Sequence, residues 1–380
     1  MRHPIVVLHG SSSPKPVSYF VQRNQAYGHW VAKLLHGQFV GNFDPHTTYE
    51  KPIYYIPART LVMNLEEAQT LGITGPEDLM GGIVPAAYVG TKAITHSLIS
   101  DDTHRPNGWS QAFTEAIKDI VLPGFSVFSK EDGLQAGMRL LEDGEVRFKP
   151  ASGRSGRDQA VIASRGDLLH HVSRMDSQEL QTYGLVLERN LRDINTLSVG
   201  TLLLDGQYIS YYGTQRMTLN NQGTVEYEGS DLFFVRGLLE HLLQLDVADN
   251  IHLAVEQAMI YDTARSHYPG IIASRRNYDV GQGYDRAGNL LSGVLEQSWR
   301  IGGATGAELC AFECFQNDAN ITAVEASTYC VFGWDKQLPP QAIVQFEDVD
   351  TGYGPMKVYT MLGKTYHGVL SASFLDSSDL

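Results

Sequence analysis

The sequence has little of what marks a small secreted or metal-stabilised protein. Its 380 residues include only three cysteines, Cys310, Cys314 and Cys330. Their number is odd and their spacing matches no common disulfide or zinc pattern, so we expect reduced thiols packed inside the fold. Charged residues make up 19% of the chain and hydrophobic residues 43%. This balance is typical of globular proteins rather than disordered ones.

A basic excess and long apolar runs are also missing. Asp and Glu number 43 against 29 Lys and Arg, which gives a formal net charge of −14. Nucleic-acid binding requires a basic surface that displaces counterions from phosphates, so this charge argues against a nucleic-acid partner. No window approaches the ~18 apolar residues of a membrane span, and the apolar run at 5–8 is too short for a signal-peptide core. We therefore expect a cytoplasmic protein with no membrane partner.

The pattern of apolar residues predicts several lobes, since about 150 residues is a usual domain size. Strands at 5–8 and 53–57 with a helix at 24–35 between them predict a layered α/β domain. Further patterns predict helices at 131–142 and 232–264, the latter interrupted around 246–250, and strands at 125–128, 146–150, 159–163, 183–188, 197–204, 207–214, 278–280, 290–296 and 307–315.

A lysine followed by a glycine-rich turn is the first candidate phosphate site. Lys149 lies at the end of a predicted strand, and the small polar tip that follows contains Gly153, Arg154, Ser155, Gly156 and Arg157. Because glycine lets backbone N–H groups approach phosphate oxygens closely, this loop fits a nucleotide phosphate. A solvated hairpin turn is the alternative. The chain has no Gly-Lys-Ser/Thr after a spaced glycine, which excludes a Walker A loop.

A strand that leaves the core at Leu187 and Glu188 is the candidate base site. A nucleotide base needs an apolar slot beside a backbone edge, and a ribose needs a carboxylate or an amide a few residues further on. Residues 189–195 supply polar side chains at that distance. A strand that simply leaves the core is the alternative interpretation.

Two carboxylates on predicted antiparallel strands form the most specific pattern. Asp279 precedes a turn at 285–289, and the returning strand carries Glu296. Two carboxylates that converge on one side suit a magnesium ion bridged to a triphosphate. Arg300, four residues beyond Glu296, is placed to neutralise phosphate charge. A surface hairpin with ion-paired side chains is the alternative.

Taken in order, these motifs resemble the ATP-grasp superfamily, and within it the carboxylate-amine ligases, as an uncharacterised bacterial family. The resemblance covers roughly residues 90–332. It implies a multi-lobe fold of mixed α/β and α+β type, in which an N-terminal α/β domain precedes a two-lobed ATP-grasp module. The implied parts are an N-terminal domain at 1–88, a small ATP-binding lobe with a flexible glycine-rich hairpin at 89–195, a large lobe with the metal site at 196–335, and a C-terminal extension at 336–380.

The resemblance also implies a set of ATP-binding residues. Lys92 resembles the first phosphate lysine of the family and Lys149 the second, which precedes the flexible loop. The segment 187–191 resembles the hinge whose backbone reads the adenine edge, with Asp193 or Asn195 placed for the ribose. The full implied set is Lys92, Lys149, Gly153, Arg154, Ser155, Gly156, Glu188, Arg189, Asn190, Leu191, Asp193 and Asn195.

Metal, catalytic and substrate positions follow from the same resemblance. The metal positions fall on Asp279, Glu296 and Ser298, with Asp285 as the alternative to Asp279. The family normally has asparagine where Ser298 stands, which leaves open whether a second metal binds. The implied catalytic cations are Arg300, Arg216 and Arg276, with Arg275 as the alternative to Arg276. The run 300–305 is similar to the Arg-x-Gly-Gly-Thr-Thr of some peptide-ligase members, which suggests that Gly302, Gly303 and Thr305 contact the acyl acceptor.

The implied function is an enzyme that uses ATP and Mg²⁺ to phosphorylate a carboxylate, after which an amine displaces the phosphate. Its partners would be the small-molecule carboxylate and amine, and a homodimer is left open. The alternatives are a small-molecule kinase or a carboxylase on the same scaffold, or a silent nucleotide-binding protein. The chain lacks a biotin-attachment motif, and a silent site has no physical need for both lysines and both carboxylates. We expect the tail from about 334 to pack as a hairpin rather than cover the substrate side.

Overall fold

The computed structural model describes residues 3–9, 18–153, 159–333, 337–348 and 354–368. Its α-helices are α1 (Ser18–Leu34), α2 (Leu65–Leu71), α3 (Gln111–Ile117), α4 (Lys130–Leu141), α5 (Arg165–Arg174), α6 (Ser177–Tyr183), α7 (Asp249–Ala264) and α8 (Thr305–Asn317). The strands are β1 (Pro4–Leu8), β2 (Gln38–Asn42), β3 (Tyr54–Pro57), β4 (Leu61–Val62), β5 (Gly82–Val84), β6 (Gly124–Val127), β7 (Val146–Pro150), β8 (Ala160–Ile162), β9 (Leu185–Arg189), β10 (Arg192–Leu204), β11 (Gln207–Leu219), β12 (Val225–Arg236), β13 (Ile272–Ala273), β14 (Arg275–Tyr284), β15 (Leu290–Ser298), β16 (Ile321–Phe332), β17 (Ile343–Asp348) and β18 (Met356–His367).

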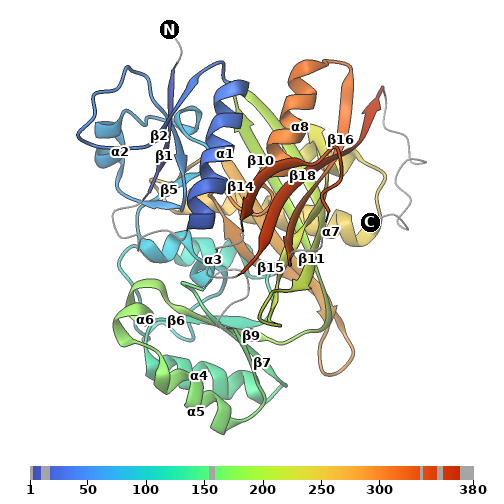
Figure 1. Cartoon of the computed structure of the whole chain (residues 1–380). Helices are drawn as coiled ribbons and strands as arrows, with labels where there is room; N and C mark the ends of the chain where they lie inside the picture. The colour runs from blue at the N-terminus through green and yellow to red at the C-terminus, as the bar shows by residue number, and fades with distance from the viewer. Residues whose placement is uncertain (1–2, 10–17, 154–158, 334–336, 349–353, 369–380) are drawn as a thin grey trace.

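The N-terminal part is built on parallel strands. β1 pairs in parallel with both β2 and β3, and α1 packs between this sheet and the large central sheet (Figure 1). Buried side chains of β1 and α1, such as Val7 and Val31, join the same apolar cluster as those of α8. Parallel strands connected by a helix form the expected α/β layer.

A small lobe follows, in which the antiparallel sheet β6-β9-β7-β8 is covered on one face by α4 and α5. Ser129 caps α4 by accepting a hydrogen bond from the Asp132 N–H at 3.1 Å, as serine does at helix starts. β7 and β8 form the predicted hairpin, so Lys149 lies near the end of a strand as expected. The lobe lies below the N-terminal domain in Figure 1, beside one end of the large sheet.

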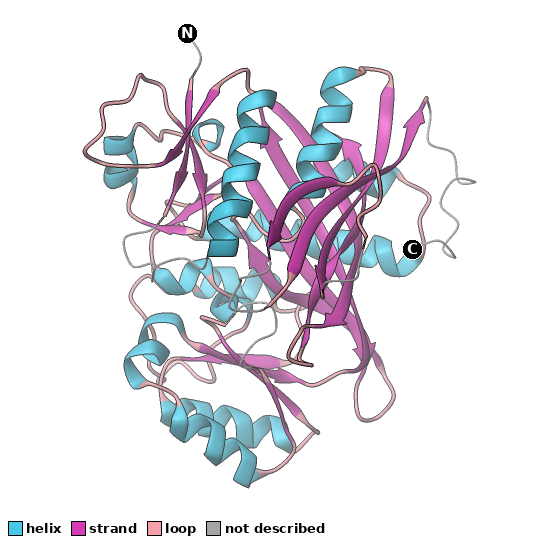
Figure 2. Ribbon diagram, in the orientation of Figure 1, coloured by secondary structure: helices cyan, strands magenta, loops and turns pink. Residues whose placement is uncertain are grey.

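The large lobe is an eight-stranded antiparallel sheet in the order β15-β14-β10-β11-β12-β16-β18-β17. Helices cover both of its faces (Figure 2). Alternate residues of a strand point to opposite faces. On β12, Phe233 packs into the cluster that contains α7, whereas Phe234 packs into the cluster that contains α8 and the N-terminal domain. The position of a residue along its strand therefore determines which face of this sheet its side chain lies on.

The C-terminal strands continue this sheet. β18 pairs with β16, and β17 pairs with β18 at the sheet edge. β17 and β18 thus pack as the expected hairpin, but Met356 and Val358 of β18 also line a cavity beside the candidate site. The strands on the two sides of the predicted boundary at 335/336 belong to one sheet. The predicted boundary at 195/196 lies inside β10.

Two local predictions were wrong. Residues 307–315 form the core of α8 rather than a strand. This segment is buried almost continuously, and a short apolar run buried on all sides does not show by its periodicity whether it is a helix or a strand. Residues 232–236 belong to β12, and the long helix begins only at Asp249. Their run of large apolar side chains packs on both faces of the sheet, which removed the alternation expected of a strand.

Two further expectations concern composition. The three cysteines are free, with Cys310 buried and Cys314 and Cys330 half-buried, as expected for packed thiols. Within the described ranges, no helix is long and apolar enough to cross a membrane.

Candidate functional site

A cavity of about 330 Å³ lies between the small lobe and the face of the large sheet that carries α8. β7 and β9 supply its wall on the small-lobe side, and β10, β11, β14 and β15 supply the sheet side. The alternation of β14 directs Arg275, Asn277 and Asp279 into this cavity. The alternation of β15 does the same for Glu296 and Ser298. The predicted acid pair therefore shares one cavity with the predicted phosphate lysine Lys149.

Asp279 and Glu296 are direct partners across the β14–β15 pair. Ser198 and Gln215, from the neighbouring strands β10 and β11, donate hydrogen bonds to Asp279 Oδ1 at 3.1 and 2.8 Å. Burial, followed by repulsion from Glu296, raises the pKa of Asp279 to about 6 despite these hydrogen bonds. Two buried carboxylates side by side repel each other, which disfavours the charged form of Asp279. The hairpin turn holds Asp285 apart from this pair, where it accepts hydrogen bonds from Asn289, so Asp279 is the carboxylate that faces Glu296.

Glu296 is held by Lys92. The Lys92 ammonium lies 2.8 Å from Glu296 Oε2 and donates a hydrogen bond to the Gly153 carbonyl at 3.0 Å. Thr91 caps the 3₁₀ turn that carries Lys92, because its hydroxyl accepts a hydrogen bond from the Ala93 N–H. Burial alone would raise the pKa of Glu296, but attraction to Lys92 outweighs it and lowers that pKa. Two positions predicted from separate motifs, Lys92 and Glu296, thus meet at one point.

Lys149 lies in a buried ion-pair group. Its ammonium pairs with Glu188 of β9, whose second carboxylate oxygen lies 3.0 Å from His96 Nε2. Only 2% of the Glu188 surface is exposed. Burial would raise the pKa of Glu188, but attraction to Lys149 and the hydrogen bond from His96 lower it to about 2. The sequence analysis did not predict His96. It lies four residues after Lys92, in a segment from which only the lysine was predicted as a site residue.

An apolar slot adjoins this group. It is lined by Leu122, Leu191, Ile194 and Leu295, together with Glu188 and Arg189, which matches the predicted hinge in position. Asn190 lies outside the lining of this cavity, and its side-chain amide donates a hydrogen bond to Glu145 at 3.1 Å. Asp193 and Asn195 are exposed and lie outside the cavity lining, whereas Ile194 and Thr196 line it. The two residues predicted for the ribose therefore do not line this cavity, and they lie next to an irregularity in the pairing of β10 with β14.

Asn277 is the main cavity residue that sequence reasoning missed. It lies directly across the strand pair from Ser298, the position at which the resemblance to the ATP-grasp superfamily implies an asparagine. Its side chain is 7% exposed and its amide nitrogen has no hydrogen-bond partner. Buried amide groups without a hydrogen-bond partner are rare, so we expect a bound ligand to accept a hydrogen bond from this one. The alternation Arg275, Asn277, Asp279 was the signal in the sequence.

The predicted arginines fall on two faces. Arg275 lines the cavity, is 1% exposed, and pairs with Glu308 of α8 at 2.7 Å. Arg276 points to the opposite face, where its Nε lies 2.8 Å from Asp262 of α7. Arg216 also lies outside the cavity lining and pairs with Asp231. Of the two alternatives on β14, the one at the cavity is Arg275, and Arg276 is held away from it by strand alternation.

The predicted substrate segment is partly at the cavity. Gly302 and Gly303 line it, and so does Arg300. Thr305 is fully buried at the start of α8, where its hydroxyl accepts a hydrogen bond from the Gly302 N–H at 2.8 Å. It thus shapes the loop without lining the cavity. Arg154, Ser155, Gly156 and Arg157 lie outside the described residues.

The cavity suits a metal that arrives with a phosphate ligand. Across the described ranges, no group of three or more His, Cys, Asp or Glu side chains is arranged to hold a metal ion. Mg²⁺, however, is usually held by one or two carboxylates together with substrate phosphates. Asp279 and Glu296 supply those carboxylates, and the unpartnered Asn277 amide and the nearby lysines suit phosphate oxygens. The residues present therefore fit magnesium bound with a nucleotide, and Asp279 and Glu296 are the side chains that would hold it.

Comparison with known sequences gives one match. Residues 7–360 match the family described as "Protein of unknown function (DUF3182)". No curated protein matches the chain.

Comparison with solved structures gives the same fold at very low identity. The carboxyaminoimidazole ribonucleotide synthase of Aspergillus clavatus in complex with ATP is 11% identical with a TM-score of 0.51, covering 95% of this chain and 94% of its own. The biotin carboxylase domain of the Hydrogenobacter thermophilus 2-oxoglutarate carboxylase, with MgADP and bicarbonate, is 10% identical with a TM-score of 0.52, covering 94% and 86%. The phosphoribosylamine–glycine ligase of Thermotoga maritima is 12% identical with a TM-score of 0.50, covering 94% and 92%. These are ATP-grasp proteins, and the predicted ATP-grasp fold is confirmed.

Proposed function

The chain belongs to the DUF3182 family and has the ATP-grasp fold, and from this premise we propose that it is an ATP- and Mg²⁺-dependent ligase that joins a carboxylate to an amine. Its nucleotide site is the cavity between the small lobe and the large sheet. The adenine lies in the slot of Leu122, Leu191, Ile194 and Leu295, and the phosphates lie near Lys92 and Lys149.

The observation that carries this proposal is the pairing of Asp279 with Glu296 in one cavity with Lys149, while Lys92, which lines an adjoining opening, contacts Glu296. An unfavourable pair of carboxylates beside buried ammonium groups is an arrangement that a metal–phosphate complex would relieve. Salt-bridged surface strands would instead pair each acid with its own cation in solvent. Strongly perturbed carboxyl groups that share a cleft favour a functional site over a structural one.

In the proposed reaction, a carboxylate oxygen attacks the γ-phosphorus of ATP, the bond to the β,γ-bridging oxygen breaks, and ADP leaves. The amine then attacks the acyl carbon, phosphate departs, and the amine loses a proton. Lys92, Lys149 and Arg300 supply positive charge around the transferring group, which is the usual contribution of the protein in phosphoryl transfer. Bound Mg²⁺ would add the neutralisation of phosphate charge that such transfers require.

The test is a screen for ADP release with Mg²⁺ and pairs of carboxylates and amines, followed by mass spectrometry of the product. We expect Glu296→Gln to abolish ADP formation while the variant remains folded, because it removes one of the two metal-facing charges. Glu115→Gln is the matched control, since Glu115 is exposed on α3, away from the cavity, and forms an ion pair with Lys118. Full turnover in Glu296→Gln would refute the assignment of the site.

The product decides between the proposed ligase and its rivals. A stable phosphorylated product without use of the amine would indicate a kinase, and a requirement for bicarbonate would indicate a carboxylase. Saturable ATP binding with no ADP release across the whole screen would favour a silent nucleotide-binding protein.

A further inference from the structure

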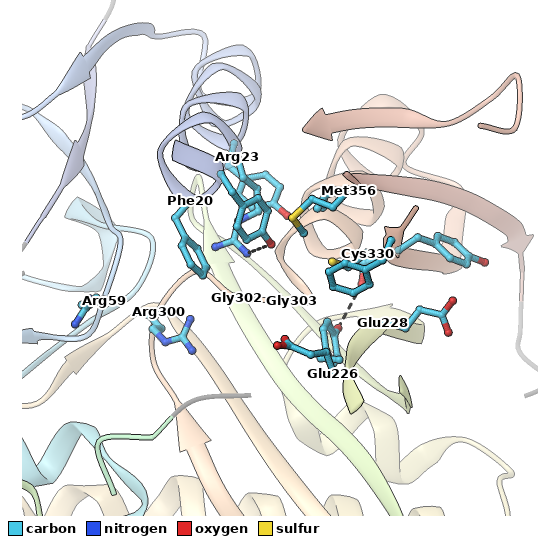
Figure 3. Close-up of a pocket in the computed structure, with 17 residues that line it drawn as sticks. Phe20, Arg23, Arg59, Glu226, Glu228, Arg300, Gly302, Gly303, Cys330 and Met356 are labelled. Atoms are coloured by element: carbon cyan, nitrogen blue, oxygen red, sulfur yellow. Dashed lines mark hydrogen bonds between the residues drawn. The ribbon is translucent and has the colours of Figure 1, made fainter. Parts of the chain in front are cut away.

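A second cavity of about 250 Å³ adjoins the nucleotide cavity. Tyr227, Arg300, Gly302 and Gly303 line both cavities, so they form the boundary between them. α1 of the N-terminal domain supplies one wall, and β12, β16 and β18 of the large sheet supply the others. In Figure 3, Arg23 and Phe20 of α1 face Glu226 and Glu228 across the cavity, and Arg59 and Arg300 lie together at one side.

Arg23 is a buried cation that forms no ion pair with any residue the structure describes. Its side chain is 8% exposed and lines the cavity. It donates hydrogen bonds to the Tyr19 hydroxyl at 3.1 Å and to Asn24 Oδ1 at 3.3 Å, and its guanidinium lies 5.2 Å from the centre of the Phe20 ring. No carboxylate of the described chain lies within ion-pair distance, and its buried Nε has no hydrogen-bond partner.

Burying a charge without an opposite charge is costly, and natural proteins seldom retain one without a use for it. The ring faces of Tyr19, Phe20 and Tyr27 offset part of this cost by cation–π attraction. They supply no acceptor for the free Nε–H. An anionic group of a bound molecule would supply both the charge and the acceptor.

A second cationic point lies toward the nucleotide. Arg59 is half-buried and makes no hydrogen bond or ion pair with any described residue, and Arg300 lies beside it in the view of Figure 3. Arg59 and Arg300 also line a third opening that reaches Lys92 and Glu296. A carboxylate held here is at the boundary with the proposed phosphate site, where it would be phosphorylated.

Apolar side chains line part of the cavity beside these cationic points. Phe20, Tyr329, Phe332 and Met356 line it. The cavity is smaller than the roughly 300–1,000 Å³ of drug-sized ligand sites, which limits the occupant to a small molecule. On the β12 wall, Glu226 accepts a hydrogen bond from Asn220 and Glu228 lies 3.9 Å from Arg216. Two carboxylates there disfavour an anion, so the anionic groups of an occupant belong at the α1 and Arg59 sides.

We infer that the carboxylate substrate is a small dianionic acid with an apolar body, one acidic group on Arg23 and the carboxylate to be phosphorylated near Arg59 and Arg300. This inference rests on the proposed ligase function, since it names the substrate class of that site.

The test uses isothermal titration of the full-length, nucleotide-free protein with three probes: phenylsuccinate, 3-phenylpropionate and succinate. 3-Phenylpropionate lacks the second carboxylate, and succinate lacks the apolar ring. We expect phenylsuccinate to bind at least about 10-fold more tightly than either, and Arg23→Gln to weaken phenylsuccinate binding by about 10- to 100-fold, the range for a hydrogen bond to a charged group. The affinity for 3-phenylpropionate should not change in this variant. Arg139→Gln is the matched control, because Arg139 is an exposed arginine of α4 that stacks on Phe125.

A thermal melt separates a binding role from a structural one. Because Arg23 carries an uncompensated charge, Arg23→Gln should melt at the same or a higher temperature than the parent in the absence of ligand. A large fall in melting temperature, or failure to fold, would assign Arg23 a structural role and overturn the inference. So would equal affinities for phenylsuccinate and 3-phenylpropionate.

The measured affinities for the acid probes do not depend on whether the protein forms ADP, because the titration needs no ATP. ADP formation that depends on Glu296 but occurs only with monocarboxylates would refute this inference and leave the ligase proposal intact. Arg23-dependent binding of phenylsuccinate with no ADP formation would support this site and refute the ligase proposal.

Discussion

Replacing Glu188 by glutamine should destabilise the nucleotide-free protein in a pH-dependent way. Attraction to Lys149 and the hydrogen bond from His96 outweigh burial and lower the pKa of Glu188 from an ordinary value of 4.5 to about 2. At about 1.4 kcal/mol for each tenfold change, this shift corresponds to about 3 kcal/mol of folding free energy at neutral pH. The figure agrees with the roughly 3–5 kcal/mol lost when one partner of a buried ion pair is removed.

The sign of the pH dependence follows from the direction of the shift. A carboxyl group whose pKa is lower in the folded state stabilises the protein above its unfolded pKa, and this contribution is lost as the pH falls through the folded pKa. The difference in unfolding free energy between the parent and Glu188→Gln should therefore be full above about pH 6. It should be about 1 kcal/mol smaller at pH 4 and less than half its neutral value at pH 3.

The assay is urea unfolding of both proteins at pH 7, 5, 4 and 3 without nucleotide. Glu115→Gln is the control, since Glu115 forms an exposed ion pair with Lys118 and its removal should change stability little. A difference for Glu188→Gln that stays constant from pH 7 to pH 3 would refute the reasoning, because it would show that the carboxylate charge is not the source of the stability.

Two further predictions concern the cavity and its boundary. Asn277→Ala should leave the unfolding free energy of the free protein nearly unchanged, because its amide nitrogen has no partner there, and should weaken MgATP binding about 10-fold by titration calorimetry; unchanged affinity would contradict a ligand at Asn277. Gly303→Ala should cost roughly 1–3 kcal/mol in urea unfolding, since its Cβ would lie 2.5 Å from the Tyr227 ring, whereas Gly302→Ala should cost little because the nearest atom is 3.8 Å away. Equal losses of unfolding free energy in the two variants would show that the Tyr227 ring moves aside without cost, and would contradict this prediction.

Much of the fold could be predicted from the sequence wherever a helix or strand has one buried face and is bounded by turn residues. The hairpin of β7 and β8 and the paired β14 and β15 follow from strand patterns bounded by turn residues. α8 could not be predicted, because it is buried on nearly every side and its apolar run therefore lacks a polar face. β12 carries large apolar side chains on both faces for the same reason.

The site shows the same division. Lys149, Asp279 and Glu296 were found because each lies in a local motif, and the structure brings all three into one cavity. Asn277 and Arg275 were missed or left as alternatives because their importance comes from strand register, which fixes the face of every second residue. Arg23 could not be found at all. Its significance comes from what is absent around it in space, and no local pattern on α1 shows that a buried arginine has no acid beside it.

The most direct test of the proposed nucleotide site is a crystal structure of the protein in complex with Mg²⁺ and a non-hydrolysable ATP analogue. We expect adenine in the slot of Leu191 and Leu295 and phosphates within hydrogen-bond distance of Lys92 and Lys149. We also expect density for a metal between the phosphates and the carboxylates of Asp279 and Glu296. A nucleotide bound elsewhere, or a cavity still empty at saturating analogue, would contradict the proposed site.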